Sequence, residues 1–225
     1  TRDEYLALHE DCKLEEFSVI DKLEESSGFK IDKDYFENLA LHTQVCIKKS
    51  KLNYQHGRIL YTTLSKYIQD NSCNSINIIE TGTARGFSSI CMSKAINDTG
   101  KSGLIYTCDI IPHNKKIYWN CIDDADSKKT RKELLSHWKD EVKNIKFYKG
   151  KSETIFKKIR VERFHFAFLD AVHDYKEVIS EFKYVRNKQK KGDIIVFDDV
   201  TASLFPGVVK AIDEVRKNKE YSIKH

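Results

Sequence analysis

The fold expected for this chain is decided by the stretch Ile76–Ser89, INIIETGTARGFSS. A run of mostly β-branched residues ends in the acid Glu80, a glycine-spaced turn follows, and a helix begins after Gly86. A turn that leads into a helix presents free backbone N–H groups, and such groups bind small anionic or zwitterionic ligands. The stretch therefore predicts a strand, a turn and a helix that together hold a ligand.

The composition of the turn narrows the choice of ligand. The turn keeps the outer glycines, Gly82 and Gly86, of a G-x-G-x-x-G-like loop but has Ala84 in place of the middle glycine. Because that glycine lets the backbone approach a pyrophosphate, its absence argues against a dinucleotide. Glu80 beside the turn would repel a phosphate and suits an ammonium group. S-adenosylmethionine (SAM), which carries a sulfonium, an α-amino group and a carboxylate, matches these features.

Acids also follow the other apolar runs of the chain. Because the carboxyl ends of parallel strands share one edge of a sheet, these acids are expected to converge there. Asp109, at the second strand end, is expected to bind the hydroxyls of a ribose. The runs are Leu104–Cys108 before Asp109, His165–Leu169 before Asp170, and Asp193–Phe197 before Asp198 and Asp199.

Alternating strand and helix patterns predict an α/β fold. We expect a doubly wound, mostly parallel Rossmann-like sheet with helices on both faces. Residues 1–70 are expected to form an N-terminal helical cap within the same domain as the SAM-binding region, 71–225. A final strand beginning at Tyr221 stops abruptly, which suggests that the chain is cut short before it closes. The expected strands are 76–80, 104–109, 144–149, 164–170 and 192–198, and the expected helices are 86–97, 128–140, 152–159, 174–189 and 207–217.

Composition excludes several classes of protein. The chain has 225 residues, of which 40% are hydrophobic, and no linker divides it. No apolar run approaches the ~20 residues that span a bilayer, and no signal peptide is visible. Six scattered cysteines indicate reduced thiols and a cytoplasmic location. The net charge of +5 comes from lysines on helix faces, so no nucleic-acid partner is expected, and a homodimer is compatible with the sequence.

Four motifs in this order resemble those of class I SAM-dependent methyltransferases. Within that class, the sequence is similar to the metal-dependent O-methyltransferases related to catechol and macrocin O-methyltransferases. The resemblance covers about Ile76 to Val200. The motifs are Glu80–Ser89, Asp109, Gly150–Glu153, and the pair Leu169–Tyr175 and Phe197–Val200.

The resemblance implies roles for particular residues. The backbone of Gly82 and the side chain of Ser88 would contact the amino acid part of SAM, and Ser152 would contact the adenine. With the residues of the glycine turn and the strand-end acids, the expected cofactor-binding set is Glu80, Gly82, Thr83, Ala84, Gly86, Ser88, Asp109, Ser152 and Asp170.

The chemistry of O-methylation explains the carboxylates at the last two strand ends. The acceptor oxygen must be partly deprotonated and held close to the methyl group. A hard divalent cation such as Mg²⁺ does both, and carboxylates are its preferred ligands. Asp170, Asp198 and Asp199 are therefore expected to bind the metal. Catechol-type enzymes carry Asn where this chain has Asp199, which resembles the sugar-modifying branch and leaves the number of direct ligands open.

His173 is the expected general base, and Asp170 is the other expected catalytic residue. His173 follows Asp170 where catechol-type enzymes place a basic lysine, and an imidazole is a competent base near neutral pH. Asp174 is instead expected to cap the next helix. The expected substrate is a small molecule or sugar that carries a hydroxyl group. The alternatives are a SAM-binding module without catalysis and a nicotinamide-dependent oxidoreductase, which Ala84 and the acid trio disfavour.

Overall fold

The computed structural model describes residues 1–170, 174–218 and 220–223. The chain forms two compact units. One comprises Thr1–Ser75, Thr83–Gly103 and Ile111–Ile145 and is called the helical unit below. The other comprises Ile76–Gly82, Leu104–Ile110 and Lys146–His225, contains almost all of the β-sheet, and is called the sheet unit.

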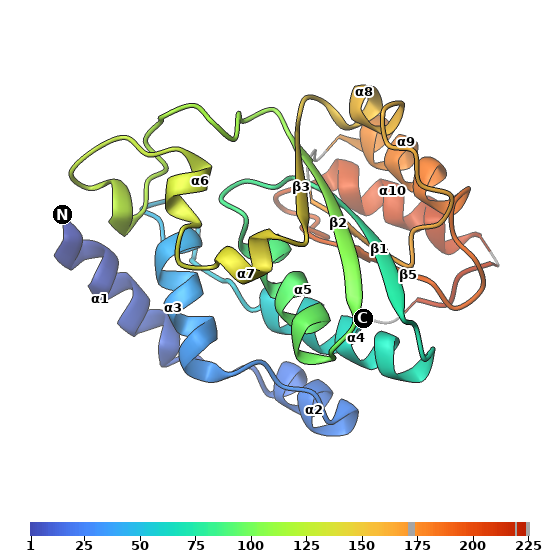
Figure 1. Cartoon of the computed structure of the whole chain (residues 1–225), viewed down its shortest axis with the longest axis horizontal. Helices are drawn as coiled ribbons and strands as arrows, with labels where there is room; N and C mark the ends of the chain where they lie inside the picture. The colour runs from blue at the N-terminus through green and yellow to red at the C-terminus, as the bar shows by residue number, and fades with distance from the viewer. Residues whose placement is uncertain (171–173, 219, 224–225) are drawn as a thin grey trace. The chain divides into compact units, whose positions relative to one another are not determined.

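The sheet has five strands in the order β3-β2-β1-β4-β5 (Figure 1). The chain moves outward from β1 in one direction and then returns to the other side of β1, so the strand order reverses between β1 and β4. Ligands of open α/β sheets bind outside the carboxyl ends of the strands at such a reversal. The strands are β1 (Ser75–Thr81), β2 (Ser102–Asp109), β3 (Ile145–Lys149), β4 (Phe166–Leu169) and β5 (Ile194–Phe197).

The register of the strands places three strand ends at one level. β1 and β4 are parallel with Thr81 opposite Leu169, and β4 and β5 are parallel with Leu169 opposite Phe197. The parallel α/β sheet predicted from the sequence is therefore confirmed, as is the Rossmann-like class. The residues that follow these strands leave the sheet side by side.

Three helices belong to the sheet unit: α8 (Ser152–Phe156), α9 (Tyr175–Arg186) and α10 (Pro206–Arg216). α9 begins as expected at the cap Asp174, whose side chain accepts a hydrogen bond from the N–H of Lys176 at 2.8 Å. Apolar residues of α9 and α10 pack together in one buried cluster, which includes Val178, Phe182 and Ile212. Helical spacing of these residues explains why the two segments form amphipathic helices.

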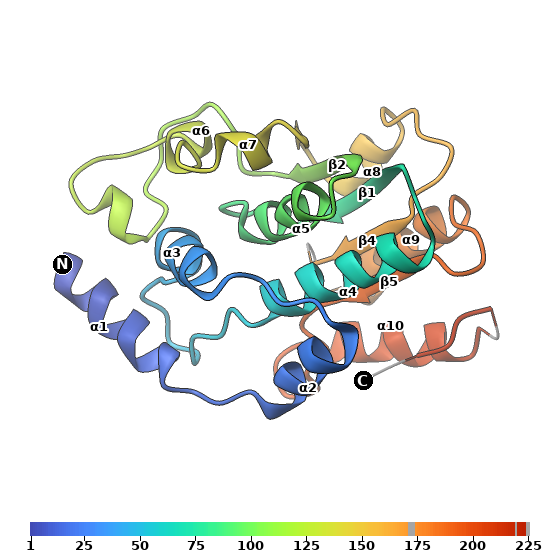
Figure 2. The ribbon, with the colours of Figure 1, turned by 60° about the horizontal axis from the view of Figure 1, so that its bottom comes forward.

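The helical unit contains the other helices of the described chain (Figure 2). α4 and α5 approach closely at Gly57, where a Cβ atom would lie 2.6 Å from the ring of Phe87. This unit holds the four helices of residues 1–70. Its elements are α1 (Arg2–Lys13), α2 (Ser18–Ser27), α3 (Lys33–Thr43), α4 (His56–Asp70), α5 (Phe87–Asp98), the 3-10 helix η1 (Ile122–Asp124), α6 (Arg131–Leu134) and α7 (Lys139–Val142).

The structure differs from the sequence-based expectation in two segments. The helix expected over 128–140 is two short helices: α6 ends at Leu134, and α7 begins after its N-cap Trp138, whose ring centroid lies 5.9 Å from that of His42. No strand begins at Tyr221 within the described residues 221–223. The hydroxyl of Tyr221 instead donates to Gln189 at 2.9 Å. Of the described helices, none has the length and apolar character that crossing a membrane requires.

Candidate active site

Two of the predicted metal ligands follow neighbouring strands of the sheet unit. The N–H of Asp170 donates to the carbonyl oxygen of Thr81 at 3.1 Å, and the N–H of Asp198 donates to that of Leu169 at 3.3 Å. The backbone ladder thus continues one residue beyond β4 and β5. Asp170 and Asp198 therefore lie in one row of the sheet, at the ~4.8 Å spacing of adjacent strands.

Negative charge accumulates around Asp170. Burial, followed by the nearby carboxylates of Asp198 and Asp199, raises the pKa of Asp170 to about 9. Glu80 and Glu181 act on it in the same direction. Neighbouring carboxylates repel one another when they are ionised, so a proton on Asp170 or a bound cation would relieve this repulsion.

Asp199 lies in a tight turn after β5. Its φ is +56°, a left-handed conformation that aspartate tolerates better than most residues. Its N–H donates to the Asp198 carboxylate at 2.8 Å, and its carbonyl accepts from the N–H of Thr201 at 2.7 Å. The turn therefore keeps both carboxylates at the end of β5.

The acids share an edge of the sheet but do not form a complete set of metal ligands. Within residues 1–170, 174–218 and 220–223, no three side chains of His, Cys, Asp or Glu are arranged to hold a metal ion. His173, the predicted base, lies outside the described residues. The metal site and the base both remain predictions.

In the sheet unit, the ends of β1, β2 and β3 are joined by backbone hydrogen bonds. Gly82, with φ of +89°, donates from its N–H to the carbonyl of Cys108 at 3.0 Å. Gly150 likewise donates to the carbonyl of Asp109 at 2.8 Å. Glu80 in β1 is fully buried. Glu80, Gly82 and Asp109 are thus held in the sheet unit at its carboxyl edge, where the sequence predicts them.

The rest of the predicted cofactor turn lies in the helical unit. Gly86 closes it by donating to the carbonyl of Thr83 at 2.7 Å, and α5 begins at the next residue. Ala84 and Gly86 have φ of +43° and +96°. Thr83 and Ser88 are buried. The strand, turn and helix expected from Ile76–Ser89 are therefore all present.

Sequence reasoning missed two arginines that hold this turn. Arg131 of α6 is 1% exposed and donates from Nε to the carbonyl of Ala84 at 2.8 Å. Arg85 donates from Nε to the carbonyl of Trp119 at 2.7 Å, and the Arg131 guanidinium lies 5.4 Å from the Trp119 ring centroid. No local pattern identifies these contacts, because they join segments far apart in the sequence.

Sequence reasoning also missed a buried acid in the sheet unit. Glu181 of α9 accepts a hydrogen bond from the hydroxyl of Thr81 at 2.9 Å. A signal was present, because Glu181 falls within the apolar stripe formed by Val178, Phe182 and Val185.

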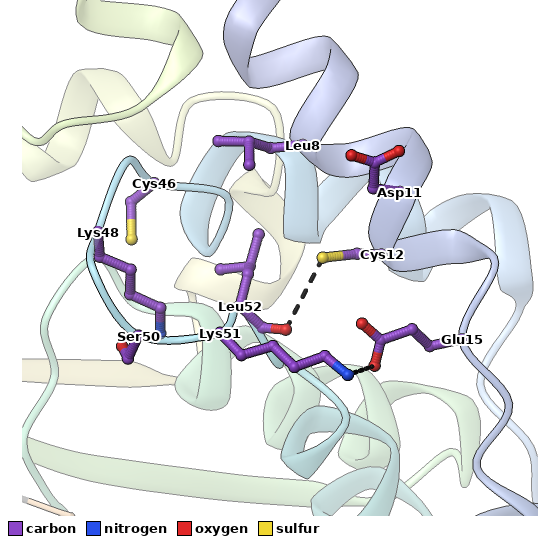
Figure 3. A pocket seen from close by; sticks show the side chains of 9 residues that line it. All are labelled: Leu8, Asp11, Cys12, Glu15, Cys46, Lys48, Ser50, Lys51 and Leu52. Atoms are coloured by element: carbon purple, nitrogen blue, oxygen red, sulfur yellow. Dashed lines mark hydrogen bonds and ion pairs between the residues drawn. The ribbon is translucent and has the colours of Figure 1, made fainter.

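A cavity of about 240 Å³ lies elsewhere, within the helical unit (Figure 3). Lys51 and Glu15 form an ion pair of 3.0 Å across it, and the thiol of Cys12 faces the carbonyl of Leu52 at 3.8 Å. None of the predicted site residues lines this cavity, so it is separate from the proposed chemistry.

Comparison with known protein families identifies the class. Residues 79–200, more than half of the chain, match the model of a methyltransferase domain. The chain belongs to this family and is a class I SAM-dependent methyltransferase. No curated protein sequence matched it.

Solved structures share the fold at low sequence identity. The O-methyltransferase NovP is 13% identical, with a TM-score of 0.58 over 100% of this chain and 94% of NovP. The SAH-bound Podospora anserina methyltransferase PaMTH1 is 14% identical, with a TM-score of 0.55 over 90% of this chain and 86% of that one. CalS11, a TDP-rhamnose 3'-O-methyltransferase of calicheamicin biosynthesis, is 15% identical, with a TM-score of 0.54 over 92% and 88%.

Proposed function

We propose that the protein is a divalent-metal-assisted O-methyltransferase that acts on a hydroxyl group of a small molecule or sugar. The proposal rests on one observation: Asp170 and Asp198 lie side by side in the same row of the sheet, at the ends of β4 and β5. Asp170 follows β4, which borders the strand-order reversal, and Asp198 follows the neighbouring strand β5. An α/β sheet binds its ligands outside the carboxyl ends of its strands at such a reversal.

SAM binding is assigned to the residues at the carboxyl edge of the sheet and to the turn that continues from β1. Glu80 would attract the α-amino group, and Asp109 would accept hydrogen bonds from the ribose hydroxyls. The turn residues Gly82, Thr83, Ala84 and Gly86 and the side chain of Ser88 would surround the methionine part, and Ser152 would contact the adenine. Bound SAM supplies an electrophilic methyl group on its sulfonium.

The acids at the ends of β4 and β5 fit a hard divalent cation. Their donor atoms are all carboxylate oxygens, which hard divalent cations prefer, and burial together with the carboxylates of Asp198 and Asp199 raises the pKa of Asp170. Mg²⁺ held by Asp170 and Asp198, with Asp199 as a further ligand, would orient the acceptor hydroxyl and acidify it. We assign removal of the hydroxyl proton to His173.

Two observations favour a sugar or another small hydroxyl compound as the acceptor. CalS11 carries a name that specifies methylation of a nucleotide-linked sugar, and NovP is named an O-methyltransferase. Asp199, where catechol-type enzymes carry Asn, points the same way. The cytoplasmic location stays a prediction from the sequence. The homodimer remains a prediction.

A panel of hydroxyl compounds tests the proposal. Release of S-adenosylhomocysteine (SAH) is measured with sugars, nucleotide sugars and phenols, each in Mg²⁺ and in EDTA. We expect at least one acceptor to be methylated in Mg²⁺ and not in EDTA. Equal turnover in EDTA would refute metal assistance, whereas SAH binding without turnover of any acceptor would favour a catalytically silent SAM-binding module.

A further inference from the structure

Two histidines of the helical unit have neighbouring rings. His42 lies in the last turn of α3, and His137 lies between α6 and α7. The ring centroids are 6.0 Å apart, and the ring planes make an angle of 35°. His42 is half-buried, whereas His137 is exposed. The proposed transfer chemistry uses neither of them.

An acid fixes the orientation of the His42 ring. The carboxylate of Asp123, in η1, forms a hydrogen bond with Nδ1 of His42. Because carboxylate oxygens only accept hydrogen bonds, Nδ1 carries the hydrogen, and the neutral imidazole has its lone pair on Nε2. Among the described residues, no hydrogen bond occupies Nε2. Metal-binding histidines are held in this way, with one nitrogen on the ion and the other donating to a carboxylate.

A buried indole holds the corner of the chain that carries His137. The N–H of Trp138 donates to the carbonyl of Leu135 at 3.1 Å, which closes the turn between α6 and α7. The Trp138 ring is 3% exposed, and its centroid lies 5.9 Å from the ring centroids of both His42 and His137. The two imidazoles are therefore positioned against one rigid side chain.

The separation of the two rings fits one shared ion. Bonds from zinc to histidine nitrogen are about 2.0–2.1 Å long. With such bonds, the ring centres of two imidazoles on one ion lie about 4.5–6.5 Å apart, depending on the angle between the bonds at the ion. The 6.0 Å between His42 and His137 falls within this range. Because His137 is exposed, its ring can turn toward an ion without disturbing the core.

We propose that His42 and His137 bind a divalent transition-metal ion such as Ni²⁺ or Zn²⁺, with Asp123 as the residue that orients His42. Imidazole nitrogens suit these ions, whereas Mg²⁺ prefers oxygen ligands. Within the described part of the chain, no third side chain of His, Cys, Asp or Glu completes the site, so water supplies the remaining ligands. The ion joins α3 to the corner between α6 and α7. A Cβ atom on Gly86 would lie 2.8 Å from Leu135, so this corner also packs against the proposed cofactor turn.

The indole beside the two histidines provides the signal for the test. Ni²⁺ is titrated into the full chain in excess Mg²⁺, which occupies the proposed site of the strand-end acids, and tryptophan fluorescence is recorded. We expect saturable quenching, because the paramagnetic ion binds beside Trp138. His42→Gln and His137→Gln should each abolish the saturable quenching, since each removes one of the two protein ligands. Asp123→Asn should weaken the apparent Ni²⁺ affinity by about tenfold or more, as loss of a carboxylate behind a histidine ligand does.

Three control variants should retain the quenching. Asp126→Asn is matched to Asp123→Asn, because it removes an acid of the same segment whose side chain is 83% exposed. Asp170→Asn and His173→Gln alter the proposed catalytic site instead. Thermal unfolding gives a second readout that does not depend on fluorescence. Ni²⁺ should raise the melting temperature of the unmodified protein and leave that of His137→Gln unchanged, because an ion that binds only the folded state stabilises it.

Two results would overturn the inference. One is the absence of both saturable quenching and thermal stabilisation by Ni²⁺ in the unmodified protein. The other is quenching that persists in both His42→Gln and His137→Gln, or that disappears in Asp170→Asn, because the ion would then bind elsewhere. Methylation that depends on Mg²⁺ is measured separately, so failure of this inference leaves the proposed function as it stands.

Discussion

Arg131 donates from Nε to the backbone carbonyl of Ala84, at 2.8 Å. Ala84 has φ of +43°, a conformation that is costly for a residue with a Cβ atom. A buried guanidinium from α6 therefore stabilises the proposed cofactor turn at the position where related loops use glycine. The shape of the turn depends on this long-range contact as well as on its own sequence.

Replacing Arg131 should weaken cofactor binding. Arg131→Met keeps an unbranched apolar side chain but removes the hydrogen bonds to the carbonyls of Ala84 and Ile111. Hydrogen bonds from charged groups contribute about 1.5–3 kcal/mol, so we expect SAH affinity to fall about tenfold to a hundredfold, with a lower melting temperature. Calorimetry measures the affinity. Lys132→Met, at the exposed next position, is the control, and equal affinities for the two variants would contradict the role of Arg131.

Substitutions of Gly86 and Gly100 distinguish two costs of adding a Cβ atom, backbone strain and steric overlap. Both have positive φ, but a Cβ on Gly86 would lie 2.8 Å from Leu135 Cδ1, whereas a Cβ on Gly100 meets nothing within 4 Å. Gly100→Ala should cost about 1 kcal/mol of unfolding free energy from backbone strain alone. Gly86→Ala should cost more and should also weaken SAH binding. Denaturant unfolding gives the first quantity, and equal losses would show that Leu135 yields freely.

Asp170 should make the stability of the metal-free protein depend on pH. In the unfolded chain, Asp ionises near its ordinary pKa of ~3.9. In the folded protein, the pKa is about 9, so between these values the folded state holds more protons. The contribution of Asp170 to the free energy of unfolding is therefore fully present at low pH and is lost as pH rises toward 9.

The Asp170→Asn variant isolates this effect because its side chain cannot ionise. In EDTA, the melting temperature of the variant minus that of the unmodified protein should grow between about pH 5 and pH 9. Mg²⁺ at about pH 8 should raise the melting temperature of the unmodified protein and leave that of the variant nearly unchanged. A difference that stays constant with pH would mean that Asp170 ionises normally.

The sequence predicts the sheet well because its signals are local. Each strand is a short apolar run with an acid or turn residue after it, and the register then brings Asp170 and Asp198 to the same level. The continuous helix expected over 128–140 was wrong: the chain leaves helical geometry after Leu134 and resumes it after Trp138, whose ring contacts those of His42 and His137.

The residues that support the site could not be predicted in the same way. An arginine in a helical segment is normally expected to be exposed, and only the tertiary fold shows that Arg131 is buried against Ala84. Glu181 is visible in the sequence as an acid within an apolar stripe, but its hydrogen-bond partner Thr81 comes from a separate element. The sequence indicated which acids converge; it carried no information on how their side chains are oriented.

Binding of Mn²⁺, followed by electron paramagnetic resonance in the presence of SAH, tests the central claim without a known acceptor. The account predicts one bound Mn²⁺ that Mg²⁺ displaces. Asp170→Asn and Asp198→Asn should each abolish this binding, and Asp174→Asn, which changes only the cap of α9, should retain it. Absence of a bound ion in the unmodified protein, or full binding by both strand-end variants, would contradict the proposal that these carboxylates form the metal site.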